Sequence, residues 1–235
     1  MNNRAAMEAP TPILRGTGLT KTYRLGAQGV PALAGLDIEF SAGEFTALEG
    51  PSGSGKTTLL NVLGLLDRPD GGTLLLDGED AGTLDERART HVRLERFGFI
   101  FQTFNLIPVL SARENVEYPM ALAGAGREAR EERARRLLAG VGIAEKEDVR
   151  PDLLSGGQRQ RVAIARALAN DPEIVFADEP TASLDSHTAA EILDLMRRLN
   201  EERGVAFLFA THDPRVVERA RRVVTLRDGA IAGER

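Results

Sequence analysis

The 235-residue sequence contains no cysteine, which excludes a disulfide framework and metal sites built from thiolates. It also has no excess of basic charge, because 30 lysines and arginines stand against 35 acidic residues, for a net charge of −5. Without a basic field to attract phosphate backbones or lipid headgroups, we expect the protein to bind neither nucleic acid nor anionic lipid.

Long apolar runs are missing as well. The longest, such as Val205–Ala210, are far shorter than the roughly 20 residues that span a bilayer. Residues 1–12 contain no apolar core of the kind that a signal peptide needs, and Pro10 and Pro12 indicate a loose tail. We therefore expect no direct insertion into a membrane. If the protein drives transport, the pore must belong to another chain.

The sequence does contain a glycine-rich stretch between a predicted strand, Phe45–Glu49, and a predicted helix, Thr57–Leu66. Its pattern is G-x-x-x-x-G-K-T. Such a turn points backbone N–H groups and a helix N-terminus at one spot, where they bind an anion. Lys56 supplies a positive charge for the outer phosphates, and the Thr57 hydroxyl can ligate Mg²⁺. The predicted nucleoside-triphosphate site consists of Gly50, Pro51, Ser52, Gly53, Ser54, Gly55, Lys56, Thr57 and Thr58.

The order of the predicted elements indicates an α/β fold. Residues 13–40 alternate loosely and predict two or three antiparallel strands, with turns at Leu25–Gly29 and Ala34–Gly35. We expect one domain over residues 13–235, with an N-terminal antiparallel β subdomain and a helical insertion at about 103–165. Further strands are predicted at 73–77, 97–101, 174–177, 205–210 and 223–226, and helices at 85–95, 127–138, 159–169, 186–203 and 213–220.

Two acidic residues follow a predicted strand that is apolar throughout, Ile174–Ala177. Such a strand is typical of a parallel sheet with both faces buried, and ligands bind at the carboxyl ends of these strands. Asp178 is therefore placed to hold Mg²⁺, directly or from the second shell, and Glu179 to polarise an attacking water. The structural alternative is a pair of acids that cap the next helix, and the presence of the phosphate loop argues against it.

The stretch Leu154-Ser155-Gly156-Gly157-Gln158 precedes the predicted helix Arg159–Ala169. Ser155 is a good N-cap, and the two glycines leave the helix N-terminus open to an anion. From the residues alone this is equally an ordinary capped helix after a flexible hinge, and both interpretations stay open.

The same five letters define the ATP-binding cassette family, and the sequence resembles a nucleotide-binding subunit of an ABC transporter from Leu19 to Gly229. In this comparison the stretch Gly50–Thr58 corresponds to the Walker A loop and Ile174–Asp178 to the Walker B strand. The resemblance implies a P-loop NTPase (RecA-like) core and the use of ATP and Mg²⁺. It also implies ATP hydrolysis coupled to transport.

The resemblance assigns a role to residues outside the phosphate loop. Gln102 joins Mg²⁺ and the attacking water to the helical subdomain, Glu179 is the catalytic carboxylate, and His212 contacts the γ-phosphate. The remaining assignments are the adenine platform Tyr23, the signature residues Ser155, Gly156, Gly157 and Gln158, the D-loop residue Asp185, and the Mg²⁺ ligands Thr57, Gln102 and Asp178. Without the resemblance, Tyr23 would be a packing residue, Gln102 a solvated loop residue and Asp185 a helix cap; the cap is kept as a parallel role.

In this family the signature of one subunit completes the ATP site of the other, which requires an isologous two-fold dimer. Ser155 follows Lys56 only after the helical insertion, so we expect it to lie too far from its own phosphate loop to serve it. The resemblance therefore implies a homodimer that ATP holds together and hydrolysis releases.

Stretches outside the site resemble a subgroup that contains macrolide exporters, lipoprotein-releasing systems and the cell-division ATPase. This subgroup couples ATP-driven dimerisation to a separate transmembrane permease subunit, with the ATPase on the cytoplasmic face of the inner membrane. We expect export or mechanotransmission. A regulatory assembly ATPase of the cell-division type, an importer ATPase and a stand-alone soluble ATPase remain open. The stretches concerned are Gly64–Pro69, Phe99–Gln102, Asn105–Pro108, Glu114–Val116 and Pro119.

The apolar loop Phe104–Val109 directly follows Gln102. An exposed run of this kind is a candidate docking surface for a helix of the membrane partner, and a change at the γ-phosphate can move it. The alternative is that these side chains fill the core of the helical subdomain.

Overall fold

The structure is a computed structural model that describes residues 12–26 and 28–235. The tail predicted for residues 1–12 lies outside the described residues except for Pro12. Among the described residues, none of the helices combines the length and the apolar composition needed to cross a membrane.

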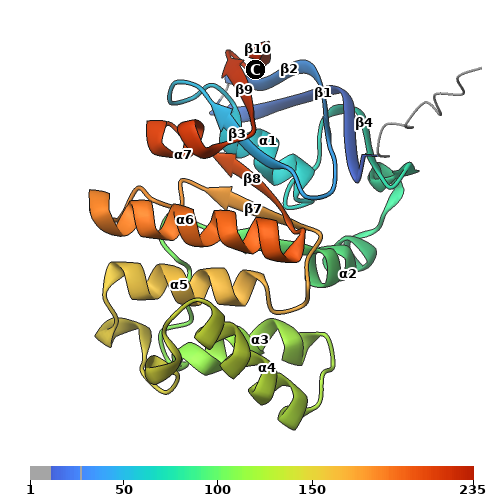
Figure 1. Cartoon of the computed structure of the whole chain (residues 1–235). Helices are drawn as coiled ribbons and strands as arrows, with labels where there is room; N and C mark the ends of the chain where they lie inside the picture. Colours follow the sequence, from blue (N-terminus) through green and yellow to red (C-terminus); the bar gives the residue numbers. More distant parts are fainter. Residues whose placement is uncertain (1–11, 27) are drawn as a thin grey trace, which may run out of the picture.

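A six-stranded sheet forms the centre of the molecule, in the order β10-β9-β3-β8-β7-β6 (Figure 1). Five neighbouring strands are parallel, and β10 pairs with β9 in the hairpin predicted at Asp228-Gly229. The parallel α/β core is therefore confirmed. The strands are β3 (Phe45–Glu49), β6 (Phe97–Ile100), β7 (Ile174–Asp178), β8 (Ala206–Ala210), β9 (Arg222–Arg227) and β10 (Ala230–Glu234).

Both faces of this sheet are buried, as the unbroken apolar strands predict. Along β7, Val175 and Ala177 face a core shared with helices α3 to α6, whereas Ile174 and Phe176 face a second core beneath the antiparallel sheet. Since the carboxyl ends of parallel strands meet at one edge, Glu49, Asp178 and Ala210 end their strands side by side. Open α/β sheets bind their ligands at this edge.

The N-terminal sheet is antiparallel and has the order β2-β1-β4-β5, which confirms the predicted β subdomain. The turn predicted at Ala34–Gly35 is wrong. Thr20 pairs with Ala34 and Leu19 with Leu36, so Gly35 is the extra residue of a β-bulge inside one strand, and its φ of 85° suits glycine. The strands are β1 (Leu14–Leu25), β2 (Gln28–Phe40), β4 (Gly71–Leu76) and β5 (Glu79–Asp80).

Helices pack on both sides of the central sheet, and α3 and α4 lie at the end of the molecule opposite to β1 and β2 (Figure 1). The α-helices are α1 (Lys56–Leu63), α2 (Glu86–Arg96), α3 (Ala112–Leu122), α4 (Arg127–Gly140), α5 (Gly156–Ala167), α6 (Ser186–Arg203) and α7 (Pro214–Arg219). The 3₁₀ turns are η1 (Ala81–Thr83), η2 (Ala144–Lys146) and η3 (Pro151–Leu153).

Three helices differ from the prediction, and one of them is α1, which ends at Leu63 rather than Leu66. Helix α3 is absent from the prediction because its internal Pro119 weakens the helical pattern, although Ser111 and Glu114 form a capping box that marks its start. Helix α5 begins at Gly156 rather than Arg159, because Ser155 and Gln158 form a second capping box. Ser155 is the N-cap, as predicted, and both glycines lie in the first turn.

Candidate functional site

The phosphate loop joins the end of β3 to the start of α1. Gly55, with a φ of 102°, precedes the first helical residue, and a Cβ atom there would lie 2.4 Å from the Ala32 carbonyl oxygen. Only glycine permits this close approach of the loop to β2. The N-terminal N–H groups of α1 carry no side-chain cap, so they remain free to receive an anion.

Lys56 is buried and folds back over the loop. Its ammonium donates hydrogen bonds to the carbonyl oxygens of Gly50, at 2.8 Å, and Pro51, at 3.0 Å. An ammonium group has three N–H donors, so one remains for a phosphate oxygen. The burial fixes the positive charge at the loop rather than in solvent.

Asp178 lies across from the loop at the end of β7. The Thr57 hydroxyl donates a hydrogen bond to the Asp178 carboxylate at 3.1 Å, although 121 residues separate the two. Burial raises the pKa of the Asp178 carboxyl above its ordinary value; the Thr57 hydrogen bond opposes this effect and the charge of Glu179 adds to it. A carboxylate that is costly to keep ionised gains from a nearby cation.

Glu179 is held from two sides. Its carboxylate accepts a hydrogen bond from the Thr211 hydroxyl at 3.0 Å, and its other oxygen lies 2.6 Å from Nδ1 of His212. The Glu179 backbone has a φ of 45°, a strained conformation for this residue type that is common at functional sites. The strand ends of β7 and β8 thus orient one carboxylate and one imidazole toward the same cavity.

This cavity has a volume of about 620 Å³ and opens over the phosphate loop. Of the residues predicted for the site, its lining includes Ser52, Gly53, Gly55, Lys56, Thr57, Thr58, Gln102, Glu179 and His212. Sequence reasoning did not identify Val30, Pro31 and Ala32 as part of the wall, because no local pattern shows that the β1–β2 hairpin folds back onto the loop.

Other predicted residues do not line this cavity. Tyr23 is 39% exposed and its hydroxyl donates a hydrogen bond to Asp67 at 2.8 Å. Residues 155–158 begin α5, and Asp185 caps α6 by accepting hydrogen bonds from the backbone N–H groups of His187 and Thr188. The cap is the parallel role expected for Asp185.

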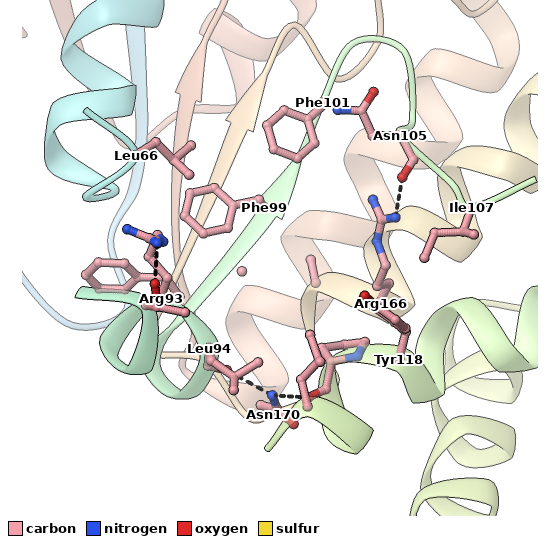
Figure 2. Close-up of a pocket in the computed structure, with 16 residues that line it drawn as sticks. Leu66, Arg93, Leu94, Phe99, Phe101, Asn105, Ile107, Tyr118, Arg166 and Asn170 are labelled. Atoms are coloured by element: carbon pink, nitrogen blue, oxygen red, sulfur yellow. Dashed lines mark hydrogen bonds between the residues drawn. The ribbon is translucent and has the colours of Figure 1, made fainter. Parts of the chain in front are cut away.

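A second cavity, of about 440 Å³, lies between β6, α2, α3 and α5 (Figure 2). Most of its lining is apolar, and three of its lining residues, Leu66, Tyr118 and Leu122, are 43%, 45% and 60% exposed. We refer to it as the apolar groove. The further apolar side chains of its wall come from Leu94, Phe97, Phe99, Phe101, Ile107 and Pro119.

The loop Phe104–Val109 is only partly the exposed run that the sequence analysis expected. For Phe104 the expectation is wrong, since this side chain is buried under the guanidinium of Arg159, 5.1 Å from the ring centroid. Ile107 lines the apolar groove and Val109 is 70% exposed. The loop therefore divides between core and surface.

Known sequences resemble this chain closely. The ABC transporter family matches residues 33–182, well over half of the chain. The lipoprotein-releasing system ATP-binding protein LolD 1 of Rhodopseudomonas palustris is 49% identical over 224 residues, which cover 94% of this chain and 99% of that protein. The macrolide export ATP-binding/permease protein MacB of Syntrophobacter fumaroxidans is 52% identical over 218 residues, and this chain spans 30% of its length.

A solved structure has the same fold. It is the dimeric structure of a post-hydrolysis state of the ATP-binding cassette MJ0796 bound to ADP and Pi, a protein of Methanocaldococcus jannaschii. It superposes with a TM-score of 0.87 at 42% identity and covers 94% of this chain and 97% of that one. The predicted P-loop NTPase fold is thereby confirmed. The chain belongs to the ABC transporter family, as an ATP-binding cassette that hydrolyses ATP.

Proposed function

We propose that this chain is the ATP-hydrolysing subunit of a membrane transporter and that residues 13–235 act as one domain, with a helical subdomain at about 103–165. The observation that carries the proposal is the 3.1 Å hydrogen bond between Thr57 and Asp178, which joins the phosphate loop to the strand end that bears Glu179. It supports a site in which the phosphate loop and the candidate general base Glu179 line one cavity and the candidate cation ligand Asp178 is bonded to that loop.

Mg²⁺ fits the oxygen atoms found there. It prefers a few protein oxygens completed by water and substrate phosphates, rather than a cage of carboxylates. We propose that Thr57, Asp178 and Gln102 would hold Mg²⁺, which would supply positive charge against the outer phosphates when bound.

The chain's own residues then have separate roles in hydrolysis. The loop N–H groups and Lys56 bind the phosphates, and Glu179 accepts a proton from the attacking water. Thr211 orients the Glu179 carboxylate through its 3.0 Å hydrogen bond. His212, 73% exposed at its side chain, is free to turn from Glu179 toward the γ-phosphate. Tyr23 offers an exposed ring on which adenine can stack.

We infer that two copies assemble with ATP between them. The signature residues 155–158 do not line the cavity of their own chain. The capping box of α5 uses the N–H groups of Ser155 and Gln158, so the N–H groups of Gly156 and Gly157 are the ones that suit a phosphate of a second copy's nucleotide. Asp185 is the N-cap of α6 and follows Asp178 and Glu179 closely in the sequence. The relative MJ0796, solved as a dimer with ADP and Pi, supports this arrangement.

The apolar groove is the surface that we assign to the membrane partner. Its open, mostly apolar lining suits a helix laid across it. The relatives support a permease as the occupant: one is named as an ATP-binding/permease protein of macrolide export, and another as the ATP-binding protein of a lipoprotein-releasing system. These names favour export or mechanotransmission over import. We propose that the chain acts on the cytoplasmic face of the inner membrane.

The test is to tag the protein, solubilise membranes of its native host in mild detergent and identify what co-purifies. A partner with few spans and a large extracytoplasmic domain is expected. A many-span permease with a binding protein would instead indicate an importer, and the absence of any membrane partner would contradict the proposal.

A matched pair of variants tests the groove. Leu122→Asp places a charge on a residue that lines the groove and is 60% exposed, so partner recovery should fall while the ATPase activity of the free chain is unchanged. Ala139→Asp, on an exposed position of α4 outside the groove, should leave recovery unchanged. Equal recovery with both variants would overturn the assignment of the groove.

A further inference from the structure

One short segment forms part of the wall of both cavities. We define the Gln102 loop as residues 102–110. Gln102 lines the phosphate cavity, and Asn105 and Ile107 line the apolar groove. A displacement of this loop at one cavity therefore also changes the wall of the other cavity.

The Gln102 loop is held in a backbone conformation that its residues do not favour. Phe104 has a φ of 62° and Asn105 a φ of 47°, so two consecutive residues with side chains adopt the left-handed region. Asparagine tolerates this region better than phenylalanine does. Such a pair persists only where surrounding contacts hold it in place.

Arg166 supplies those contacts from α5. Its guanidinium donates a hydrogen bond to the carbonyl oxygen of Phe104 at 2.8 Å. It donates another to the carbonyl oxygen of Asn105, which Figure 2 shows. Burial lowers the pKa of Arg166 to about 10. Within residues 12–26 and 28–235, no carboxylate lies within ion-pair distance of this guanidinium, so its charge acts on the two backbone dipoles.

A second arginine of the same helix contacts the loop as well. Arg159 lies over the Phe104 ring, and it is seven residues before Arg166, two helical turns along one face of α5. The Gln102 carbonyl also accepts a hydrogen bond from the Ser183 hydroxyl at 3.1 Å, on the segment that precedes Asp185. Helix α5, which begins with the signature residues, thus contacts the Gln102 loop through both Arg159 and Arg166.

We propose that Arg166 is a positioning residue that couples the Gln102 loop to the signature helix α5, so that Gln102, the groove wall and the N-terminus of α5 move as one body when nucleotide binds. The inference rests on the proposed function, since it takes ATP at the phosphate cavity as the event that displaces Gln102. A purely structural role would predict that loss of Arg166 lowers stability without changing the response to nucleotide.

The chain offers a matched set of variants. Arg166→Lys keeps the positive charge but replaces the fork of N–H donors by one ammonium, which cannot bridge both carbonyls in the same way. Arg166→Met removes the charge. Arg161→Lys is the control, because Arg161 also lies on α5 and donates a 2.7 Å hydrogen bond to a backbone carbonyl, that of Val141, outside the Gln102 loop.

The absence of cysteine makes the measurement simple, since one introduced cysteine takes the only label. Val109→Cys places a spin label on a side chain that is 70% exposed. The buried Asn115 side chain holds the backbone on both sides of this position, through hydrogen bonds to Ile107, Leu110 and Ser111. The label should therefore report movement of the loop. Its mobility is measured by electron paramagnetic resonance with and without MgATP, and binding is titrated separately with a fluorescent ATP analogue.

With Arg166 present, MgATP should change the mobility of the label. In Arg166→Lys and Arg166→Met that change should fall by about threefold or more, while affinity for the fluorescent ATP analogue stays within about twofold. Arg161→Lys should respond like the unsubstituted chain. An equal response in all of these chains, or no response with Arg166 present, would overturn the inference while leaving the proposed function intact. Failure of the unsubstituted chain to bind the analogue would overturn the proposed function and the inference with it.

Discussion

Oε1 of Glu179 lies 2.6 Å from Nδ1 of His212, although the two residues belong to segments that follow different strands, β7 and β8. The second oxygen of the same carboxylate accepts a hydrogen bond from Thr211. Glu179 is thus oriented at both oxygens and faces the cavity that Lys56 and Thr57 also line. This geometry suits a carboxylate that takes a proton from water.

We therefore expect Glu179→Gln to slow ATP hydrolysis by about 10²- to 10⁴-fold without loss of ATP binding. The amide has nearly the same shape and can still accept a hydrogen bond from Thr211, but it cannot take up the proton. Because the bound ATP persists, the variant should form a dimer with MgATP in light scattering. Phosphate release measures the rate. A monomer with MgATP, or a rate equal to that of the unsubstituted chain, would contradict the assignment.

Asp178→Asn should stabilise the empty protein at neutral pH. Since burial raises the pKa of Asp178 in the folded chain, the free energy of unfolding falls as the pH rises from the ordinary carboxyl pKa to the raised one, and the full cost is present at higher pH. The amide removes this cost, and it also weakens the cation site. In urea unfolding with EDTA the variant should be the more stable chain.

With MgATP the order should reverse. At a nucleotide concentration about 100 times its dissociation constant, the unsubstituted chain gains about 2.7 kcal/mol, and the variant should gain much less. Asp152→Asn, at an exposed position, is the control and should change neither value. A variant that is less stable than the unsubstituted chain in EDTA would refute the proposed cost of burying Asp178.

Gly55→Ala and Gly53→Ala separate backbone strain from steric exclusion in the phosphate loop. Both glycines have positive φ, 102° and 79°, so each substitution costs about 1–2 kcal/mol in strain. At Gly55 the new Cβ also meets the Ala32 carbonyl oxygen at 2.4 Å, whereas at Gly53 it meets nothing within 4 Å. ATP titration should show that Gly55→Ala binds at least about tenfold more weakly than Gly53→Ala, a difference of about 1.4 kcal/mol. Equal affinities would show that β2 can yield at Ala32.

Asp213 makes the stability of the chain depend on pH. Burial of this carboxyl raises its pKa, but hydrogen bonds from Arg215 and Thr181 outweigh that effect and lower it from 3.8 to about 2. A lowered pKa stabilises the folded chain above the unfolded value and loses this contribution as the pH falls from about 4 toward 2. The contribution at neutral pH is on the order of 2 kcal/mol.

Asp213→Asn should therefore lower the free energy of unfolding at pH 7 by about that amount, and asparagine still serves as the N-cap of α7. Urea unfolding of both chains should give a constant difference from pH 7 to about 5 and a smaller one at pH 3. A difference that grows as the pH falls would show that the sign is wrong.

Much of the site is encoded locally, and the sequence alone predicts that part. The spacing of Gly50, Gly55 and Lys56 defines the phosphate loop, and an acidic pair after the apolar strand Ile174–Ala177 indicates where the sheet carries its ligand. Ser155 is predictable as an N-cap for the same reason, and it caps α5. Each of these signals lies within a few neighbouring residues, so the periodicity of the chain and the chemistry of its side chains suffice.

Tertiary structure alone decided which distant segments meet. That Ala32 closes over Gly55, that Phe104 is buried under Arg159, and that Arg166 binds the carbonyls of residues 104 and 105 all depend on packing between elements far apart in the chain. Burial is a property of these packed neighbours, and the sequence pattern of a loop does not contain them. The sequence thus determined the chemistry of the site, and the packing of β2, α5 and the Gln102 loop determined its walls and its connection to the groove.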